Sequence, residues 1–276
     1  MTLIAILFAT LAAGIGSVWL AAALMRLGWG AAGRPGGRGL KEQHLLSLAA
    51  GALLATAFMH LLPEALESEH GAKELFATLL VGVVFFFLLD KAELWHHGHE
   101  HHHDHSLGAH AHEDGHHHDD HAPLRSGGWA VLTGDSVHCF GDGVLIASAF
   151  IADARLGVVA ALAVLAHEVP HHIGDLGVLH ETSGSRRAAI VKVSLAGAVT
   201  PLGGLVGWWV VGRLDPLLPF LLVVASSSFI YVALADLIPQ LQKRLSARQT
   251  TAQITWLLTG IGLVTAVRSL AHLYVE

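Results

Sequence analysis

The chain has 276 residues, of which 53% are hydrophobic and 14% are charged, and its mean hydropathy is +0.55. A typical soluble domain carries about 25% charged residues, so this composition excludes a soluble enzyme and indicates an integral membrane protein. The formal net charge of -6 leaves aside 22 histidines, an excess that points toward metal chemistry. The single cysteine, Cys139, permits no internal disulfide.

The apolar residues are gathered in eight blocks of helical length, separated by short polar breaks. A helix of about 20 residues crosses the roughly 30 Å of bilayer hydrocarbon, whereas strands of a membrane β-barrel would alternate apolar and polar residues. We therefore predict an all-α integral membrane fold with eight transmembrane helices, named spans 1 to 8 in chain order. The predicted ranges are 3–25, 44–66, 73–95, 129–152, 156–180, 187–211, 217–241 and 253–274. Span 1 lacks a basic leading region and a cleavage site, so we expect it to be retained rather than removed as a signal peptide.

Lysine and arginine residues predict the orientation of these spans, because cytoplasmic loops carry more of them than external loops. One predicted side holds Arg26, Arg34, Arg38, Lys41, Lys91, Arg125, Arg186, Arg187, Lys243, Arg244 and Arg248. The other side holds only Lys73, Arg155, Arg213 and Arg268. The first side is therefore expected in the cytoplasm, both termini are expected outside, and the short loops suit a bacterial inner membrane.

A histidine-rich segment divides the chain into residues 1–95 with spans 1 to 3 and residues 123–276 with spans 4 to 8. Residues 96–121 contain 13 histidines mixed with acids and show no apolar periodicity. We expect 96–122 to be a disordered cytoplasmic loop that binds divalent metal, zinc above all, through imidazoles and carboxylates. An incidental low-complexity tract or an affinity tag is the alternative, although a tag stands at a terminus as a pure run.

Side chains of the metal-ligand type stand inside spans 4 and 5, where an ionisable residue is a functional candidate because its burial is costly. Several repeat at four-residue spacing and so share one face of a helix. These are His138 and Asp142 in span 4, His167, His171 and Asp175 in span 5, and Glu168 and His172 on the adjoining stripe of span 5. Together they favour a metal site with several ligands over isolated buried polar residues that bond to neighbouring helices.

Weaker candidates surround this set. His60 and Glu64 lie around Pro63 in span 2, Asp236 lies in span 7, and Cys139 adjoins His138. Asp236 is a candidate for lining the pathway. For His60 and Glu64 the alternative is an ordinary helix end, and for Cys139 it is a small core residue. The glycines of spans 4 and 5 are expected to let these two helices approach closely. They are Gly141, Gly143, Gly174 and Gly177.

Two other classes of protein share parts of this pattern. His167-Glu168-Val169-Pro170-His171 matches H-E-x-x-H, the zinc-protease signature, but proline disturbs the motif and no downstream Asp-Gly supplies a further ligand. A cation-diffusion exporter also combines a histidine-rich loop with H-x-x-x-D pairs, but that family has six spans and a cytoplasmic C-terminal domain. The metalloprotease and the cation-diffusion exporter both remain alternatives to the interpretation developed next.

The motifs resemble those of the ZIP (Zrt/Irt-like) divalent-metal transporters, in the subfamily with a histidine-rich loop. That subfamily carries H-N-F-x-D-G in span 4 and H-E-x-P-H-E-x-G-D in span 5, where this chain reads HCFGDG over 138–143 and HEVPHHIGD over 167–175. HLLPE over 60–64, FFLLDK over 86–91 and YVALAD over 231–236 are similar as well. Cys139 replaces the usual Asn and His172 replaces the usual Glu, which puts the second metal site and the metal preference in question.

The resemblance implies an inverted repeat of spans 1–3 and 6–8 around central spans 4 and 5, and a homodimer. It implies a binuclear centre, with His138, Asp142, His167 and His171 holding one metal and Cys139, Asp142, Glu168 and His171 the other, and His172 as an accessory ligand. By the same resemblance spans 1, 4, 5 and 6 slide against 2, 3, 7 and 8, and metal moves into the cytoplasm. The expected partners are the lipid bilayer and divalent ions, zinc first and then iron, manganese or cadmium; no nucleic acid and no enzymatic activity is expected.

Overall fold

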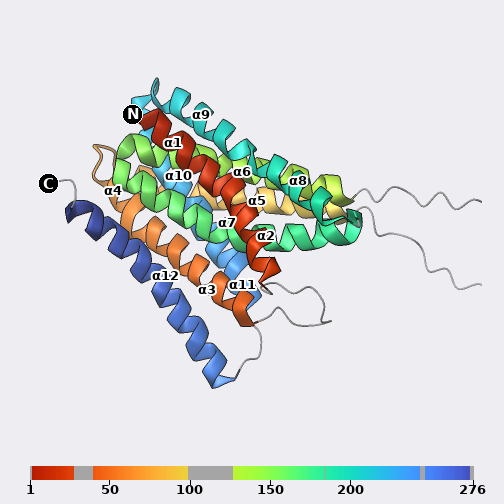
Figure 1. Ribbon diagram of the computed structural model, residues 1–276. Coiled ribbons are helices and arrows are strands. Elements are labelled where there is room, and N and C mark those ends of the chain that lie inside the picture. The colour runs from red at the N-terminus through yellow and green to blue at the C-terminus, as the bar shows by residue number, and fades with distance from the viewer. Residues whose placement is uncertain (1, 28–39, 99–126, 184, 243–245, 274–276) are drawn as a thin grey trace, which may run out of the picture.

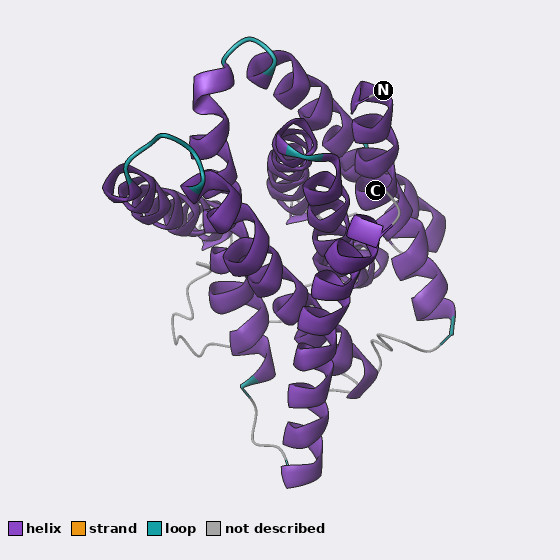
Figure 2. Ribbon diagram, turned by 90° about the vertical axis from the view of Figure 1, so that its left-hand side faces the viewer, coloured by secondary structure: helices purple, strands orange, loops and turns teal. Residues whose placement is uncertain are grey.

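The computed structural model describes residues 2–27, 40–98, 127–183, 185–242 and 246–273 (Figure 1). Every regular element in these ranges is a helix, and Figure 2 shows the helices joined by short loops. The predicted all-α class is therefore confirmed. The histidine-rich loop lies outside the described residues apart from its first three positions, so its character stays a prediction.

Eight segments of the described chain are long and apolar enough to cross a membrane, which confirms the predicted number of spans. Span 1 comprises α1 (Thr2–Leu11), η1 (Ala12–Gly16) and α2 (Ser17–Arg26), and span 2 comprises α3 (Leu40–Thr56), η2 (Ala57–Leu61) and α4 (Leu62–Leu66). Spans 3, 4 and 5 are the single helices α5 (Ala72–Gly98), α6 (Gly127–Ala152) and α7 (Ala154–Ser183). Span 6 comprises α8 (Arg186–Gly197) and α9 (Val199–Val211). Span 7 comprises η3 (Asp215–Leu217), α10 (Leu218–Tyr231), η4 (Val232–Leu237) and α11 (Ile238–Leu241), and span 8 is α12 (Ala247–Leu273).

Three spans contain a π-helical turn, a winding that occurs mostly as a short bulge inside α-helices and often at functional positions. These turns are η1 in span 1, η2 in span 2 and η4 in span 7. The turns in spans 2 and 7 hold His60 and Asp236, and each is followed after one residue by a proline, Pro63 or Pro239. His60 and Asp236 therefore lie at matching places in their helices.

Spans 4 and 5 lie near the centre of the bundle. Of the apolar stretch of each span, 56% of the residues are buried in span 4 and 67% in span 5, against 11% in spans 3 and 8. Span 2 is buried to 72%, and α12 packs along α3 at the edge of the bundle (Figure 1). The central helices are thus shielded from lipid, which lets them carry ionisable side chains.

Glycines bring particular spans into close backbone contact, because a side chain added there would collide with the neighbouring helix. Every such contact between described spans joins members of one of two sets: spans 1, 4, 5 and 6, or spans 2, 3, 7 and 8. The contacts include Gly14 and Gly143 against span 6, Gly203 and Gly207 against span 4, Gly51 against span 8 and Gly82 against span 7. Close glycine contacts therefore join spans 1, 4, 5 and 6 into one set, and they join the second set as two pairs, spans 2 and 8 and spans 3 and 7.

The expectation that the glycines of spans 4 and 5 let these two helices approach closely is wrong. Gly143 packs against span 6, and a side chain added at Gly141, Gly174 or Gly177 would meet no atom within 4 Å. Gly174 instead lines a cavity beside the polar cluster. The open space at Gly174 thus lies beside polar side chains from both helices.

Candidate metal centre

The ligand-type residues of spans 4 and 5 form one polar cluster in which three groups of side chains can hold a metal ion. The His138 group consists of His138, Asp142, His167 and Glu168. The Cys139 group consists of Asp135, Cys139, Glu168 and His172. The His171 group consists of Asp135, His171 and Asp175. The sequence prediction that the two spans bring their ligands together agrees with this geometry.

The His138 group gathers two imidazoles and two carboxylates around one point. The Nε2 atoms of His138 and His167 are 3.2 Å apart, and Glu168 Oε1 lies 3.3 Å and 3.4 Å from them. Asp142 Oδ2 lies 3.2 Å from His167 Nε2 and 3.9 Å from His138 Nε2. A tetrahedral zinc site with bonds of about 2.0–2.3 Å has ligand-to-ligand distances of roughly 3.3–3.8 Å, so the spacing fits a bound ion.

The tautomer of His167 follows from the hydrogen-bond partner of its second ring nitrogen, Nδ1. Its Nδ1 lies 3.3 Å from the carbonyl oxygen of Ala163. Because a carbonyl only accepts, Nδ1 carries the proton and the lone pair of the neutral ring is on Nε2. Nε2 therefore points its lone pair at the carboxylates of Asp142 and Glu168, an arrangement of acceptors that a cation stabilises.

The Cys139 group lies beside the first group and shares Glu168 with it. Glu168 Oε2 lies 3.1 Å from His172 Nε2 and 3.8 Å from Cys139 Sγ, while Asp135 Oδ1 lies 3.6 Å from the same sulfur. The side chains of this group are buried: Cys139 and His172 are 0% exposed and Glu168 is 1% exposed. Glu168 thus presents one oxygen to each of two enclosed groups.

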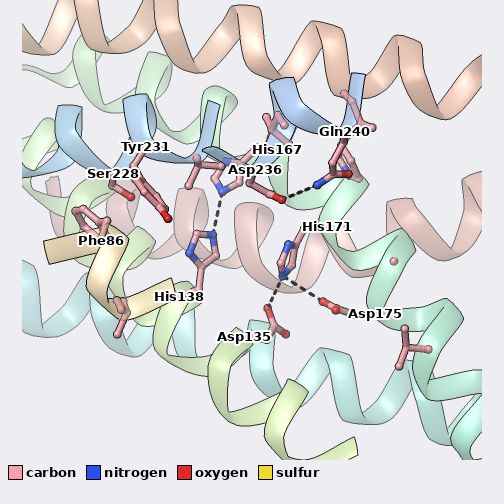
Figure 3. Close-up of a pocket in the computed structure, with 17 residues that line it drawn as sticks. Phe86, Asp135, His138, His167, His171, Asp175, Ser228, Tyr231, Asp236 and Gln240 are labelled. Atoms are coloured by element: carbon pink, nitrogen blue, oxygen red, sulfur yellow. Dashed lines mark hydrogen bonds and ion pairs between the residues drawn. The ribbon is translucent and has the colours of Figure 1, made fainter. Parts of the chain in front are cut away.

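The His171 group contains the most exposed histidine of the three groups. His171 Nε2 lies 3.5 Å from Asp175 Oδ2 and 3.8 Å from Asp135 Oδ1, and the His171 side chain is 40% exposed. Figure 3 shows both carboxylates pointing toward this ring, below the pair formed by His138 and His167. The resemblance implied that His171 joins both metals of the binuclear centre, whereas in the structure its nitrogen groups with Asp135 and Asp175.

A cavity of about 380 Å³ adjoins the cluster and reaches residues of spans 2, 3, 4, 5 and 7. Its polar lining includes Asp135, His138, His167, His171 and Asp175. Asp236 also lines it and accepts a hydrogen bond from the Gln240 amide at 2.5 Å (Figure 3). Of the Cys139 group only Asp135 reaches the cavity wall, so this group is enclosed while the other two open to the cavity.

His60 and Glu64 do not belong to the cluster. They line a second cavity of about 180 Å³, together with Asp153 and Arg155 at the turn between α6 and α7. His60 is buried, at 2% exposure. Their metal role therefore stays a prediction for a separate site.

Asp135 is the residue that the sequence reasoning missed. Its carboxylate belongs to both the Cys139 group and the His171 group, although it was not among the predicted ligands. Its spacing of four residues before Cys139 was a usable signal, because that spacing puts both side chains on one helix face. An acid near the predicted start of a span is, however, also typical of an ordinary helix end.

Comparison with known proteins identifies relatives of the chain. A family model described as ZIP zinc transporter matches residues 91–268. Human zinc transporter ZIP10 is 33% identical over 163 residues, which is 55% of this chain and 18% of that protein. Human zinc transporter ZIP4 is 35% identical over 136 residues, or 49% of this chain and 20% of that protein. Rat zinc transporter SLC39A7 is 34% identical over 161 residues, or 54% of this chain and 33% of that protein.

The matched segment therefore spans only a fifth to a third of the length of these relatives. All three are named as zinc transporters, and none is named as an enzyme or as a cation-diffusion exporter. The metalloprotease and exporter interpretations of the sequence find no support in them.

Proposed function

This chain belongs to the ZIP zinc transporter family, and we propose that it carries zinc, as a divalent cation, across a membrane into the cytoplasm. The observation that carries the proposal is the convergence of acceptor atoms from spans 4 and 5 at the wall of a cavity. The groups contain four carboxylates, those of Asp135, Asp142, Glu168 and Asp175. Inside a membrane such charges need compensation, and two divalent ions supply four positive charges.

Ions pass, in this proposal, between groups that share a carboxylate. Glu168 joins the His138 group to the Cys139 group, and Asp135 joins the Cys139 group to the His171 group. A shared ligand lets an ion change one bond at a time, whereas a rigid four-ligand site of the structural kind would hold it. The proposed ligands are His138, Cys139, Asp142, His167, Glu168, His171, His172 and Asp175, and we add Asp135 because its carboxylate lies in two groups.

The proposed direction, into the cytoplasm, rests on the resemblance, and the position of the two cavities indicates which end of the pathway faces each side. The larger cavity runs from the cluster toward Val178 and Gln240, near the ends of spans 5 and 7 that continue into the lysine- and arginine-rich loops. The positive-inside rule puts those loops in the cytoplasm. The smaller cavity, with His60 and Glu64, lies at the other ends of the helices and is the proposed outer entrance. The structure then represents a state open to the cytoplasm.

Alternating access is proposed to follow the two sets of helices described above. The cluster belongs to spans 4 and 5, which pack with spans 1 and 6 through close glycine contacts. Glycine contacts likewise join span 2 to span 8 and span 3 to span 7. Close glycine contacts hold backbones together, so a boundary without them is where helices slide. The inverted repeat is supported by HLLPE over 60–64 and DLIPQ over 236–240. Each begins in the π-helical turn of its span, 2 or 7, and continues into the short α-helix that follows.

Zinc is the proposed cargo because imidazole, carboxylate and thiolate together suit it, and the thiolate of Cys139 makes cadmium a second candidate. Iron and manganese, which prefer harder ligands, rank below these two. We further propose that the chain forms a homodimer in a bacterial inner membrane. Both termini then lie outside, and the histidine-rich loop of residues 96–122 lies in the cytoplasm.

Metal uptake by purified protein in proteoliposomes tests this function. Vesicles loaded with a zinc-responsive dye should take up zinc when they hold the wild-type protein and lose uptake with His167→Ala or Asp142→Asn. His180→Ala is the matched control, because His180 lies exposed on the same helix outside the three groups. Iron, manganese and copper are measured in parallel. Absence of metal uptake by the wild-type protein contradicts the proposal, and cleavage of a membrane substrate would favour a protease.

A further inference from the structure

His172 is held by a residue from another span. Its Nδ1 lies 3.0 Å from the hydroxyl oxygen of Ser17, the first residue of α2, which follows the π-helical turn η1 in span 1. Both side chains are fully buried, at 0% exposure. On the other edge of the ring, Nε2 faces Glu168 Oε2 at 3.1 Å and Asp135 Oδ1 at 3.8 Å. The imidazole thus bridges Ser17 and the carboxylates of the Cys139 group.

The position of each proton follows from the donors and acceptors around this ring. The Ser17 hydroxyl lies 2.5 Å from the carbonyl oxygen of Gly14, which can only accept, so the hydroxyl proton points there. The Ser17 oxygen is then left as an acceptor, and the N–H at Nδ1 of His172 donates a hydrogen bond to it. In the neutral ring the lone pair is consequently on Nε2, which makes no hydrogen bond among the described residues.

We propose that Ser17 is a positioning residue that fixes His172 in the tautomer whose Nε2 binds a divalent ion in the Cys139 group, an inference that rests on the proposed function. Metal-bound histidines commonly donate their second N–H to such a partner, which sets the ring orientation. His167 achieves the same with the backbone carbonyl of Ala163. A histidine at position 172 needs this partner, whereas the glutamate usual in the resembling subfamily presents acceptor oxygens without one.

Titration of the purified full-length protein with Cd²⁺ tests the proposal, read by the ultraviolet charge-transfer band of the cadmium–thiolate bond. Cys139 is the single cysteine, so the band reports the Cys139 group and the histidine-rich loop adds nothing to it. Loss of an outer partner of a metal-bound histidine typically weakens affinity by about 10–100-fold, and Ser17→Ala should raise the Kd for Cd²⁺ by that factor. The matched control is Ser226→Ala, another buried serine, whose hydroxyl donates to the Leu222 carbonyl at 2.9 Å.

A double-mutant cycle separates positioning from packing. In a His172→Glu background, Ser17→Ala should change the Kd for Cd²⁺ by less than about twofold, because no imidazole is left to orient. The proposal is overturned if Ser17→Ala weakens Cd²⁺ binding equally in the His172→Glu background. It is also overturned if either Ser17→Ala or His172→Ala, made alone in the wild-type protein, leaves the Kd for Cd²⁺ unchanged. Zinc uptake is measured separately: a wild-type protein that binds Cd²⁺ as expected but moves no metal removes the proposed function and leaves the role of Ser17 intact.

Discussion

Replacing Glu168 with glutamine removes the charge of a carboxylate that two of the candidate metal groups, the His138 group and the Cys139 group, share. Oε1 serves the His138 group and Oε2 serves the Cys139 group. A glutamine has one carbonyl oxygen and one NH2, so whichever way the amide turns, one group receives an N–H donor in place of a ligand. The other group keeps an oxygen without its negative charge. Both groups are therefore damaged by a change that hardly alters the size of the side chain.

The size of the effect follows from the number of ligands. Loss of an outer partner alone costs about 10–100-fold in metal affinity, so loss of one of the four ligands of a group should cost at least about 100-fold. This corresponds to at least about 2.8 kcal/mol of binding free energy. The group that keeps the neutral oxygen should lose about tenfold, comparable to the loss of one outer partner.

Two measurements follow the two groups. The cadmium–thiolate band reports the Cys139 group, and zinc uptake into proteoliposomes reports the pathway that includes the His138 group. Asp142→Asn is the comparison variant, because Asp142 belongs to the His138 group alone and should lower uptake while leaving the Cd²⁺ affinity within about threefold. If Glu168→Gln leaves both the Cd²⁺ affinity and the zinc uptake within about twofold of wild type, the shared-ligand arrangement is refuted.

Three more outcomes are expected. Cys139→Asn, which restores the residue usual in the resembling subfamily, should keep transport and shift uptake from zinc and cadmium toward manganese, because an amide oxygen is a harder ligand than a thiolate; identical relative uptake would mean that the sulfur does not contact the metal. Gly203→Ala should destabilise the protein by about 1–3 kcal/mol in thermal unfolding in detergent, since its Cβ would collide with the Phe140 carbonyl, whereas Gly262→Ala meets open space and serves as the control. Deletion of residues 96–121 should leave substantial zinc uptake with an altered dependence on metal concentration, and complete loss of uptake by an inserted variant would make the loop part of the pathway.

Composition and periodicity predicted the helical elements well, because both are properties of one helix at a time. The eight spans, and the shared face of His138 and Asp142, needed only the length and the four-residue repeat of each segment. Contacts between side chains on different helices could not be predicted for the same reason. Ser17 looks like an incidental small polar residue in an apolar block, and only the packing of span 1 on span 5 brings it 3.0 Å from His172, 155 positions later. The close approach expected at the glycines of spans 4 and 5 fails for the same reason, because sequence spacing gives the face of a helix and not what lies opposite: Gly143 meets span 6 and the other three meet open space.

The π-helical turn η1 sets the direction in which Ser17 points and so brings its hydroxyl to His172. An α-helix advances about 100° per residue, so the extra residue of a π-helical turn rotates everything after it by about that angle. Residues 12–16 therefore set which side of α2 looks inward. Winding this segment as regular α-helix with the same number of residues would leave span 1 long enough to cross the bilayer, yet it would swing the hydroxyl of Ser17 about a quarter of the way around the helix axis and away from the imidazole. The direction of one side chain in the first span is thus set by the winding of the turn before it.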